Sequence, residues 1–302
     1  MTSEHPLFAE AVQAIAAGDV EGLRTLLDRA PELVGARTEP PCSATLLHYT
    51  AFNGFEEVSH AAPATLPDIA RLLLERGAEA DALAFEDAKG TALCWALSSW
   101  FTFASGVQNA LADAYLDGGA AIEGVAGDGA PLGHAIGFGY TSAVEHLAAR
   151  GAFAQHLTAA AALGDVSRLA GWYLGDGQFS PEAATFARGA KGETGRFSWP
   201  PPSAPDLAAL ALVTAATHGR DEVVRWLLEA GVDPSASVSF DQTPLHFAAY
   251  VGHPAVVETL LAAGARTDVR ERQFDRTPAE WAEETNEPAL AARIRAHGKE
   301  RP

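Results

Sequence analysis

Ten histidines and two cysteines are the side chains of this chain best suited to metal binding or to nucleophile–base chemistry. A structural zinc site needs four ligands at short paired spacings, whereas Cys42 and Cys94 are isolated from each other. No two histidines stand four residues apart, as they do in the HExxH motif of zinc hydrolases. These spacings predict no metal site, and nothing in the sequence indicates a cofactor.

Catalysis by a serine or cysteine needs a base within hydrogen-bond reach and a third group that orients the base. The sequence contains no G-x-S-x-G motif, no phosphate-binding P-loop and no paired-carboxylate motif. Glycine-rich runs such as 124–129 lack the strand and helix that a phosphate-binding loop requires. We therefore expect no catalytic residues and no enzyme activity.

The charge balance narrows the class of partner. The chain carries 39 Asp and Glu against 21 Lys and Arg, a formal net charge of −18. Nucleic acids and anionic membranes are bound by basic surfaces, so neither is expected, whereas a basic protein partner would be attracted. No long apolar run or N-terminal signal pattern is present, which predicts a cytoplasmic location. Rare lysine beside abundant arginine and alanine is typical of a GC-rich bacterial genome.

Similar segments recur along the chain at an interval of some thirty residues. Thr243-Pro-Leu-His, Thr277-Pro-Ala-Glu and Thr45-Leu-Leu-His each begin such a segment. Threonine suits the cap of a first helix and proline its first turn. A second helix follows with helically spaced apolar residues, as at 256–261, and a glycine such as Gly264 ends it. Each segment predicts a helix pair that must stack on its neighbours to bury its apolar faces.

The pattern resembles the ankyrin repeat, whose signature is T-P-L-H-x-A-A-x-x-G followed by a closing G-A. This resemblance implies an all-α fold, an ankyrin-repeat solenoid of about eight helix-turn-helix repeats with short β-hairpin fingers. It predicts a single domain over 1–302. The repeats are expected near 9–30, 45–77, 91–119, 130–151, 155–176, 210–231, 243–264 and 277–298.

Three irregularities interrupt the repeats. Extra sequence separates the two helices of the second repeat, within 46–62, and of the third, within 98–109. Insertions at the same point of neighbouring repeats lie on one face, which is often a binding face. A long inserted loop, 177–205, is expected to be functional, partly ordered or mobile. The finger between the copies at 130 and 155 is nearly deleted. Because the long loop 177–205 takes the place of a finger nearby, we expect a local notch in the row of fingers.

The resemblance also assigns roles to several histidines. His48 and His246 occupy the histidine of the signature, which bridges backbone groups of neighbouring turns, and His253 lies in the turn between helices. Cys94 replaces this histidine in the third repeat. Because equivalent positions stack, Cys94 and His48 are the one nucleophile–base pair that the sequence allows. The core-facing position of Cys94 predicts a small buried thiol instead.

Ankyrin proteins bind partners in a groove formed by the finger tips and by two positions near the end of each first helix. Carried over copy by copy, these positions predict a partner-binding groove. Its residues are Phe52, Asn53, Ser98, Ser99, Phe138, Thr217, His218, Phe240, Gln242, Tyr250, Val251, Phe274 and Arg276. Aromatic residues at nominally exposed positions suggest interface anchors, although packing between neighbouring fingers is the alternative.

The resemblance therefore implies a non-enzymatic scaffold or adaptor, expected to be monomeric, that binds a protein or peptide in its concave groove. Two alternatives stay open. The insertions within 46–62 and 98–109 and the loop 177–205 could cover a small-molecule or catalytic site. The acidic charge also suits an inhibitor or immunity protein that masks a basic enzyme.

Overall fold

The computed structural model describes residues 5–52, 61–85, 90–183 and 204–300. The chain divides into two compact units, Met1–Ala152 and Phe153–Pro302. Their boundary coincides with the nearly deleted finger between the copies at 130 and 155. The single domain over 1–302 stays a prediction. Asn53 and residues 184–203 of the inserted loop lie outside the described residues, so the expected notch stays a prediction as well.

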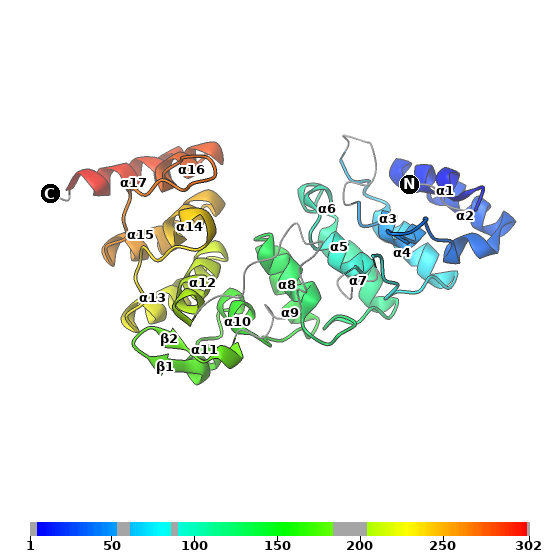
Figure 1. Ribbon diagram of the computed structural model, residues 1–302. Coiled ribbons are helices and arrows are strands. Elements are labelled where there is room, and N and C mark those ends of the chain that lie inside the picture. Colours follow the sequence, from blue (N-terminus) through cyan, green and yellow to red (C-terminus); the bar gives the residue numbers. More distant parts are fainter. Residues whose placement is uncertain (1–4, 53–60, 86–89, 184–203, 301–302) are drawn as a thin grey trace. The chain divides into compact units, whose positions relative to one another are not determined.

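The described helices of the N-terminal unit follow one another as four successive repeats (Figure 1). In chain order they are α1 (Phe8–Ala17) and α2 (Val20–Arg29), α3 (Leu46–Tyr49) and α4 (Leu66–Glu75), α5 (Ala92–Ala96), α6 (Trp100–Ala104) and α7 (Gln108–Asp117), and α8 (Ala130–Gly137) and α9 (Thr141–Ala149). A 3₁₀ turn, Pro31–Gly35, follows α2. The helix α6 is the form taken by the insertion that the sequence places within 98–109.

Stacking in the N-terminal unit follows two rows. The first helices contact one another in the order α1, α3, α5, α8, and the second helices in the order α2, α4, α7, α9. In α4, Ile69, Leu72 and Leu73 are fully or almost fully buried at helical spacing. No repeat encloses its own core, so each is stabilised by burying apolar surface against its neighbours.

The C-terminal unit repeats this arrangement. Its elements are α10 (Leu157–Leu163) and α11 (Val166–Trp172), strands β1 (Tyr173–Gly175) and β2 (Gln178–Phe179), α12 (Ala204–Thr217) and α13 (Asp221–Glu229), a 3₁₀ segment (Ser239–Asp241), α14 (Pro244–Val251) and α15 (Pro254–Ala262), and α16 (Pro278–Glu284) and α17 (Pro288–Glu300). The first helices stack in the order α10, α12, α14, α16 and the second in the order α11, α13, α15, α17. Figure 1 shows these pairs in green to red.

The signature threonine and histidine form the same capping box in two repeats. The N–H of Thr243 lies 3.2 Å from His246 Nδ1, and His246 Nε2 lies 3.1 Å from the carbonyl oxygen of Arg276. Because a carbonyl only accepts, Nε2 carries the hydrogen and Nδ1 accepts. His48 bridges Thr45 and Gly90 in the same way. The predicted structural role of these two histidines is confirmed.

Glycines end most second helices, as expected. Gly231 and Gly264 have φ values of 90° and 98°, in the left-handed region that favours glycine. The expectation is wrong at the last repeat, because α17 continues through Gly298 to Glu300.

The fingers differ from the expected hairpins. Among the described residues, β1 and β2 form the only two-stranded sheet, and Arg37 pairs with Thr45 as an isolated bridge. The other described fingers are turns with few ladder bonds. Neighbouring fingers are joined by single backbone bonds, such as Phe85 N–H to the Cys42 carbonyl at 2.8 Å.

Candidate partner-binding surface

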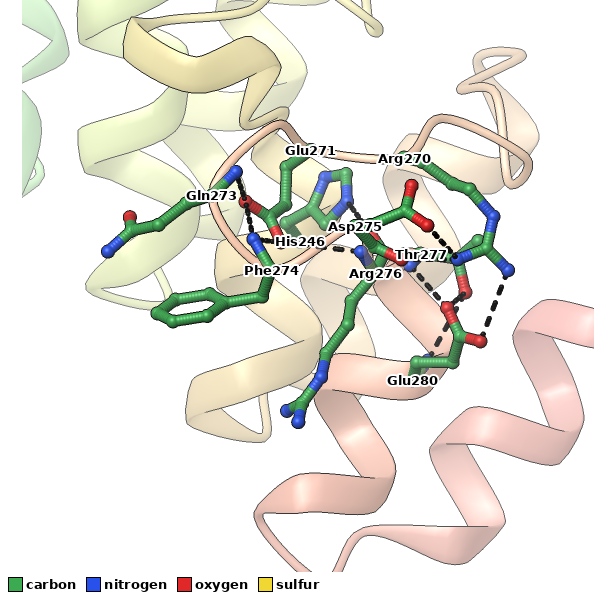
Figure 2. A network of polar contacts seen from close by, with 9 residues as sticks. All are labelled: His246, Arg270, Glu271, Gln273, Phe274, Asp275, Arg276, Thr277 and Glu280. Carbon is green, nitrogen blue, oxygen red and sulfur yellow. Dashed lines mark hydrogen bonds and ion pairs between the residues drawn. The ribbon is translucent and has the colours of Figure 1, made fainter.

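A buried glutamate organises the finger that precedes α16. Glu271 is fully buried, and its carboxylate accepts hydrogen bonds from the backbone N–H groups of Gln273 (2.7 Å), Phe274 (3.0 Å) and Arg276 (3.3 Å). Its own N–H donates to the Arg276 carbonyl at 3.1 Å, so the loop closes on itself. Figure 2 shows this network, from which the Phe274 ring projects away. Phe274 is 58% exposed on a loop whose backbone is already ordered.

The preceding finger presents a second exposed phenylalanine. Phe240 is 53% exposed and has a φ of 62°, a left-handed conformation that is unusual for an aromatic residue. Its carbonyl accepts the N–H of Arg272 at 2.8 Å, and Arg272 Nε lies 2.7 Å from Asp241 Oδ2. These contacts join the two fingers side by side. A strained backbone that holds an apolar ring in solvent is typical of a functional position.

The end of α14 continues this surface. Tyr250 is 46% exposed and Val251 is 39% exposed. The Tyr250 ring packs edge-on against Trp281, with centroids 5.5 Å apart, and Trp281 in turn packs against His246. Because His246 bonds to the carbonyl of Arg276, one series of contacts joins α14 to the finger.

Arg276 contributes charge to this area. Its guanidinium pairs with Glu284 and lies 6.0 Å from the centroid of the Phe274 ring. We define the finger–helix surface as Phe240, Tyr250, Val251, Phe274 and Arg276. All five were predicted as groove residues from the repeat register, and the structure brings them together in the C-terminal unit. Gln242 and Thr217 of the same prediction are half-buried.

Three predicted groove residues are wrong, because the structure buries them: Phe52, Ser99 and His218. The short helix α3 ends at Tyr49, and Phe52, with a φ of 50°, packs edge-on against Phe101 at 5.9 Å. Ser99 donates its hydroxyl hydrogen to the Phe52 carbonyl at 2.6 Å and caps α6. Phe52 lies in the insertion within 46–62 and Ser99 in the insertion within 98–109, and this bond joins the two.

His218 is buried for a different reason. It follows the long helix α12 on the same ridge as the buried residues Leu207, Ala211 and Thr214. Positions spaced by four and three residues lie on one helical face, and α12 packs between α10 and α14. The position that the repeat register places in the groove therefore faces the neighbouring repeats here.

The remaining predicted residues lie in the N-terminal unit. Ser98, which follows α5, is half-buried and donates its hydroxyl hydrogen to the carbonyls of Cys94 and Trp95 in that helix. Phe138 is 39% exposed and stacks on Tyr140 with centroids 5.8 Å apart. Asn53 lies outside the described residues. The structure does not join these residues to the finger–helix surface.

Burial also determines the state of the groups with potential chemistry. The Cys94 side chain is fully buried. Burial lowers the pKa of His48 to about 4 and lowers the pKa of His246, so both imidazoles are neutral at pH 7. Across residues 5–52, 61–85, 90–183 and 204–300, no three His, Cys, Asp or Glu side chains gather as metal ligands would. In the same parts, no helix is long and apolar enough to cross a membrane.

No sequence pattern singles out Glu271. Its position five residues before Arg276 carries no motif, and an acidic residue in a finger is expected to be solvated. Only the tertiary structure shows that this carboxylate faces inward and collects three backbone donors.

Comparison with known proteins found a family model and a solved structure that match this chain. Residues 212–261 match the family model described as ankyrin repeats (many copies). Among solved structures, the crystal structure of the human ASB11 ankyrin repeat domain is 20% identical with a TM-score of 0.44, and the match covers 96% of this chain and 98% of that one. The family match shows ankyrin repeats over residues 212–261. The stacked helix pairs and the threonine–histidine boxes at Thr45 and Thr243 give the described residues of both units the same repeat fold.

Proposed function

We propose that this chain is a non-enzymatic interaction protein that binds a protein partner on the finger–helix surface. Ankyrin repeats generally mediate protein–protein interactions. One observation carries the proposal to this surface: Phe240 and Phe274 are both more than half exposed on neighbouring fingers whose backbones are held by specific bonds. Aromatic residues on an ordered loop lose little conformational entropy on binding, which favours their use as anchors.

The charge around the anchors supports a protein partner. Arg272 and Arg276 are each paired with a carboxylate, Asp241 and Glu284, so the aromatic centre is surrounded by paired charges. A hydrophobic centre with a polar rim is the usual anatomy of an interface. The net charge of −18 would speed the approach of a basic partner and make association sensitive to salt.

The test compares three forms of the full chain as bait in a lysate of the source organism. These are the wild type, a Phe240→Ala/Phe274→Ala double variant, and the control Phe153→Ala, which removes a phenylalanine that is 51% exposed outside this surface. Proteins captured by the wild type and the control but lost by the double variant are then purified and titrated. Two buried aromatic anchors are expected to contribute at least about tenfold in affinity. Equal affinity of the double variant would exclude this surface.

The two alternatives from the sequence stay predictions. A small-molecule or catalytic site under the insertions depends in part on residues 53–60 and 184–203, outside the described residues. An inhibitor that masks a basic enzyme would be one specific form of the proposed partner binding. Turnover of a metabolite by the isolated chain would contradict the non-enzymatic assignment.

A further inference from the structure

Four aromatic rings form a continuous series in the N-terminal unit. Trp100 and Phe103 of α6 have centroids 5.6 Å apart, and Phe103 stacks on Tyr140 at 4.4 Å with an angle of 15° between the ring planes. Tyr140 also stacks on Phe138 at 5.8 Å. We call these four residues the aromatic ladder. Only Phe138 was among the residues predicted from the repeat register.

Three of the four rings of the ladder are exposed to solvent. Trp100 is 62% exposed, Phe103 40% and Phe138 39%, whereas Tyr140 is 5% exposed and supports the other rings. Large apolar side chains that cluster in solvent mark interaction sites more often than isolated ones do. Since the rings come from both α6 and the turn between α8 and α9, two neighbouring repeats build the cluster.

The backbone beneath the ladder is firmly held. Ser99 caps α6 and bonds to the Phe52 carbonyl, as described above. The buried Thr102 donates its hydroxyl hydrogen to the Ala96 carbonyl at 2.9 Å, and Gln108 Nε2 donates to the same carbonyl at 2.9 Å. The first bond attaches α6 to the end of α5, and the second attaches α7 to the same carbonyl of α5. The exposed rings therefore stand on an ordered base and need little ordering on binding.

The charge of the surrounding sequence selects the kind of partner. Between Lys89 and Arg150 the chain has no lysine or arginine and five carboxylates. These are Asp113, Asp117, Glu123, Asp128 and Glu145. The face of an aromatic ring attracts cations, most strongly for tryptophan, and arginine is the cation most often found there. Arg150 pairs with Asp113 and Asp117, so residues 90–150 carry five carboxylates against one arginine and keep a net negative charge. A cationic side chain would therefore meet aromatic rings in a negative field, which would repel an anionic partner.

We propose that the aromatic ladder is a second docking surface, which takes an arginine-bearing basic segment of a protein partner. The exposed ring of Trp100 receives the guanidinium, and the apolar surface of Phe103 and Phe138 covers the aliphatic part of the segment. This inference goes beyond the proposed function, because the ladder lies in the other unit and shares no residue with the finger–helix surface.

Fluorescently labelled Gly/Ser peptides that carry arginine, lysine, glutamate or proline at the same positions test the proposal by anisotropy titration of the full chain. The arginine peptide should bind most tightly, the lysine peptide less, and the glutamate peptide should not bind. Trp100→Leu keeps an apolar side chain but removes the aromatic face, and should weaken the arginine peptide about fivefold. Trp100→Phe should restore part of that loss. Phe153→Ala removes an exposed phenylalanine outside both surfaces and should leave the affinity unchanged.

Three outcomes would overturn the proposal. The arginine peptide could bind no better than the glutamate peptide, Trp100→Leu could leave its affinity unchanged, or the proline peptide could bind most tightly, which would indicate a proline-rich partner. Circular dichroism and thermal unfolding of each variant verify that the chain is folded. The Trp100 variants leave the finger–helix surface intact, and the Phe240→Ala/Phe274→Ala variant leaves the ladder intact, so failure of one surface is distinguishable from failure of the other.

Discussion

At the scale of single residues, buried polar side chains have the largest consequences. Glu271 accepts hydrogen bonds from three backbone N–H groups while fully buried. Its replacement by alanine would leave those donors without their partner, and each buried donor left unsatisfied costs about 1–3 kcal/mol.

We expect Glu271→Ala to lower the free energy of unfolding by about 3 kcal/mol in urea titrations. The loss is smaller than the sum over three donors, because the loop can relax and expose some of them to water. The matched control is Glu258→Ala, which removes an exposed partner of Arg293. Exposed ion pairs contribute little, so this variant should unfold near the wild-type midpoint. Similar midpoints for Glu271→Ala and Glu258→Ala would show that the buried network does not stabilise the finger.

His48 predicts a dependence of stability on pH. Burial lowers its pKa from the ordinary value of 6.5 to about 4, so the folded state excludes a proton that the unfolded state binds. Protonation of His48 therefore stabilises the unfolded state as the pH falls below about 6.5, and the free energy of unfolding decreases until about pH 4. The slope contributed by one such histidine is about 1.4 kcal/mol per pH unit.

His48→Gln tests this dependence, because glutamine can still complete the capping box. Urea titrations between neutral pH and about pH 4.5 should show a shallower loss of stability for the variant than for the wild type. His246, whose pKa burial also lowers, adds a slope of the same sign to both proteins. Parallel curves would mean that His48 binds protons equally in the folded and unfolded states.

At the scale of the element, helix ends and helix interiors predict opposite effects of the same substitution. Gly264 follows α15 with a φ of 98°, whereas Gly171 lies inside α11, and an added Cβ would meet no atom within 4 Å at Gly171. At Gly171 there is room for the methyl group of alanine. At Gly264 the left-handed backbone conformation decides the effect of the substitution.

Gly264→Ala should destabilise the protein by about 1 kcal/mol, because alanine is strained in the left-handed region. Gly171 lies in the last turn of α11, and Gly171→Ala should stabilise the protein by up to about 0.5–1 kcal/mol, since alanine has the higher helix propensity. Thermal or urea unfolding of the two variants gives the comparison. Changes of the same sign would contradict the assigned helix end.

At the scale of the whole molecule, the two units have separate cores made of nearest-neighbour contacts. In a repeat protein, each repeat is stabilised only by the repeats that it touches. A cavity in one unit should therefore loosen that unit first.

Leu260→Ala, in α15, and Leu111→Ala, in α7, each truncate a fully buried side chain. Each should cost about 2–5 kcal/mol locally. Hydrogen exchange with mass spectrometry should show increased exchange within 153–302 for the first variant and within 1–152 for the second. Equal increases in both units for either variant would indicate that the chain unfolds as one cooperative body.

The repeat architecture was predictable from sequence because its signals are local. Thr243 with His246, and the apolar spacing of 256–261, specify caps and buried faces within a few residues, and every predicted repeat has its helix pair in the structure. The finger–helix residues followed from the same register, since regular copies preserve it. Phe52, Ser99 and His218 could not be placed, because an insertion and a long helix redirect side chains that the register leaves exposed.

By itself, the sequence determined the all-α repeat fold, the acidic charge and the residues that begin each helix pair, because capping and helical periodicity depend on near neighbours along the chain. The tertiary structure alone decided that Glu271 faces inward, that Phe52 is buried and that the exposed rings of Trp100, Phe103 and Phe138 form one series with the buried Tyr140. The physical reason is that these outcomes depend on which residues from different repeats compete for the same space, and that competition exists only once the repeats have stacked.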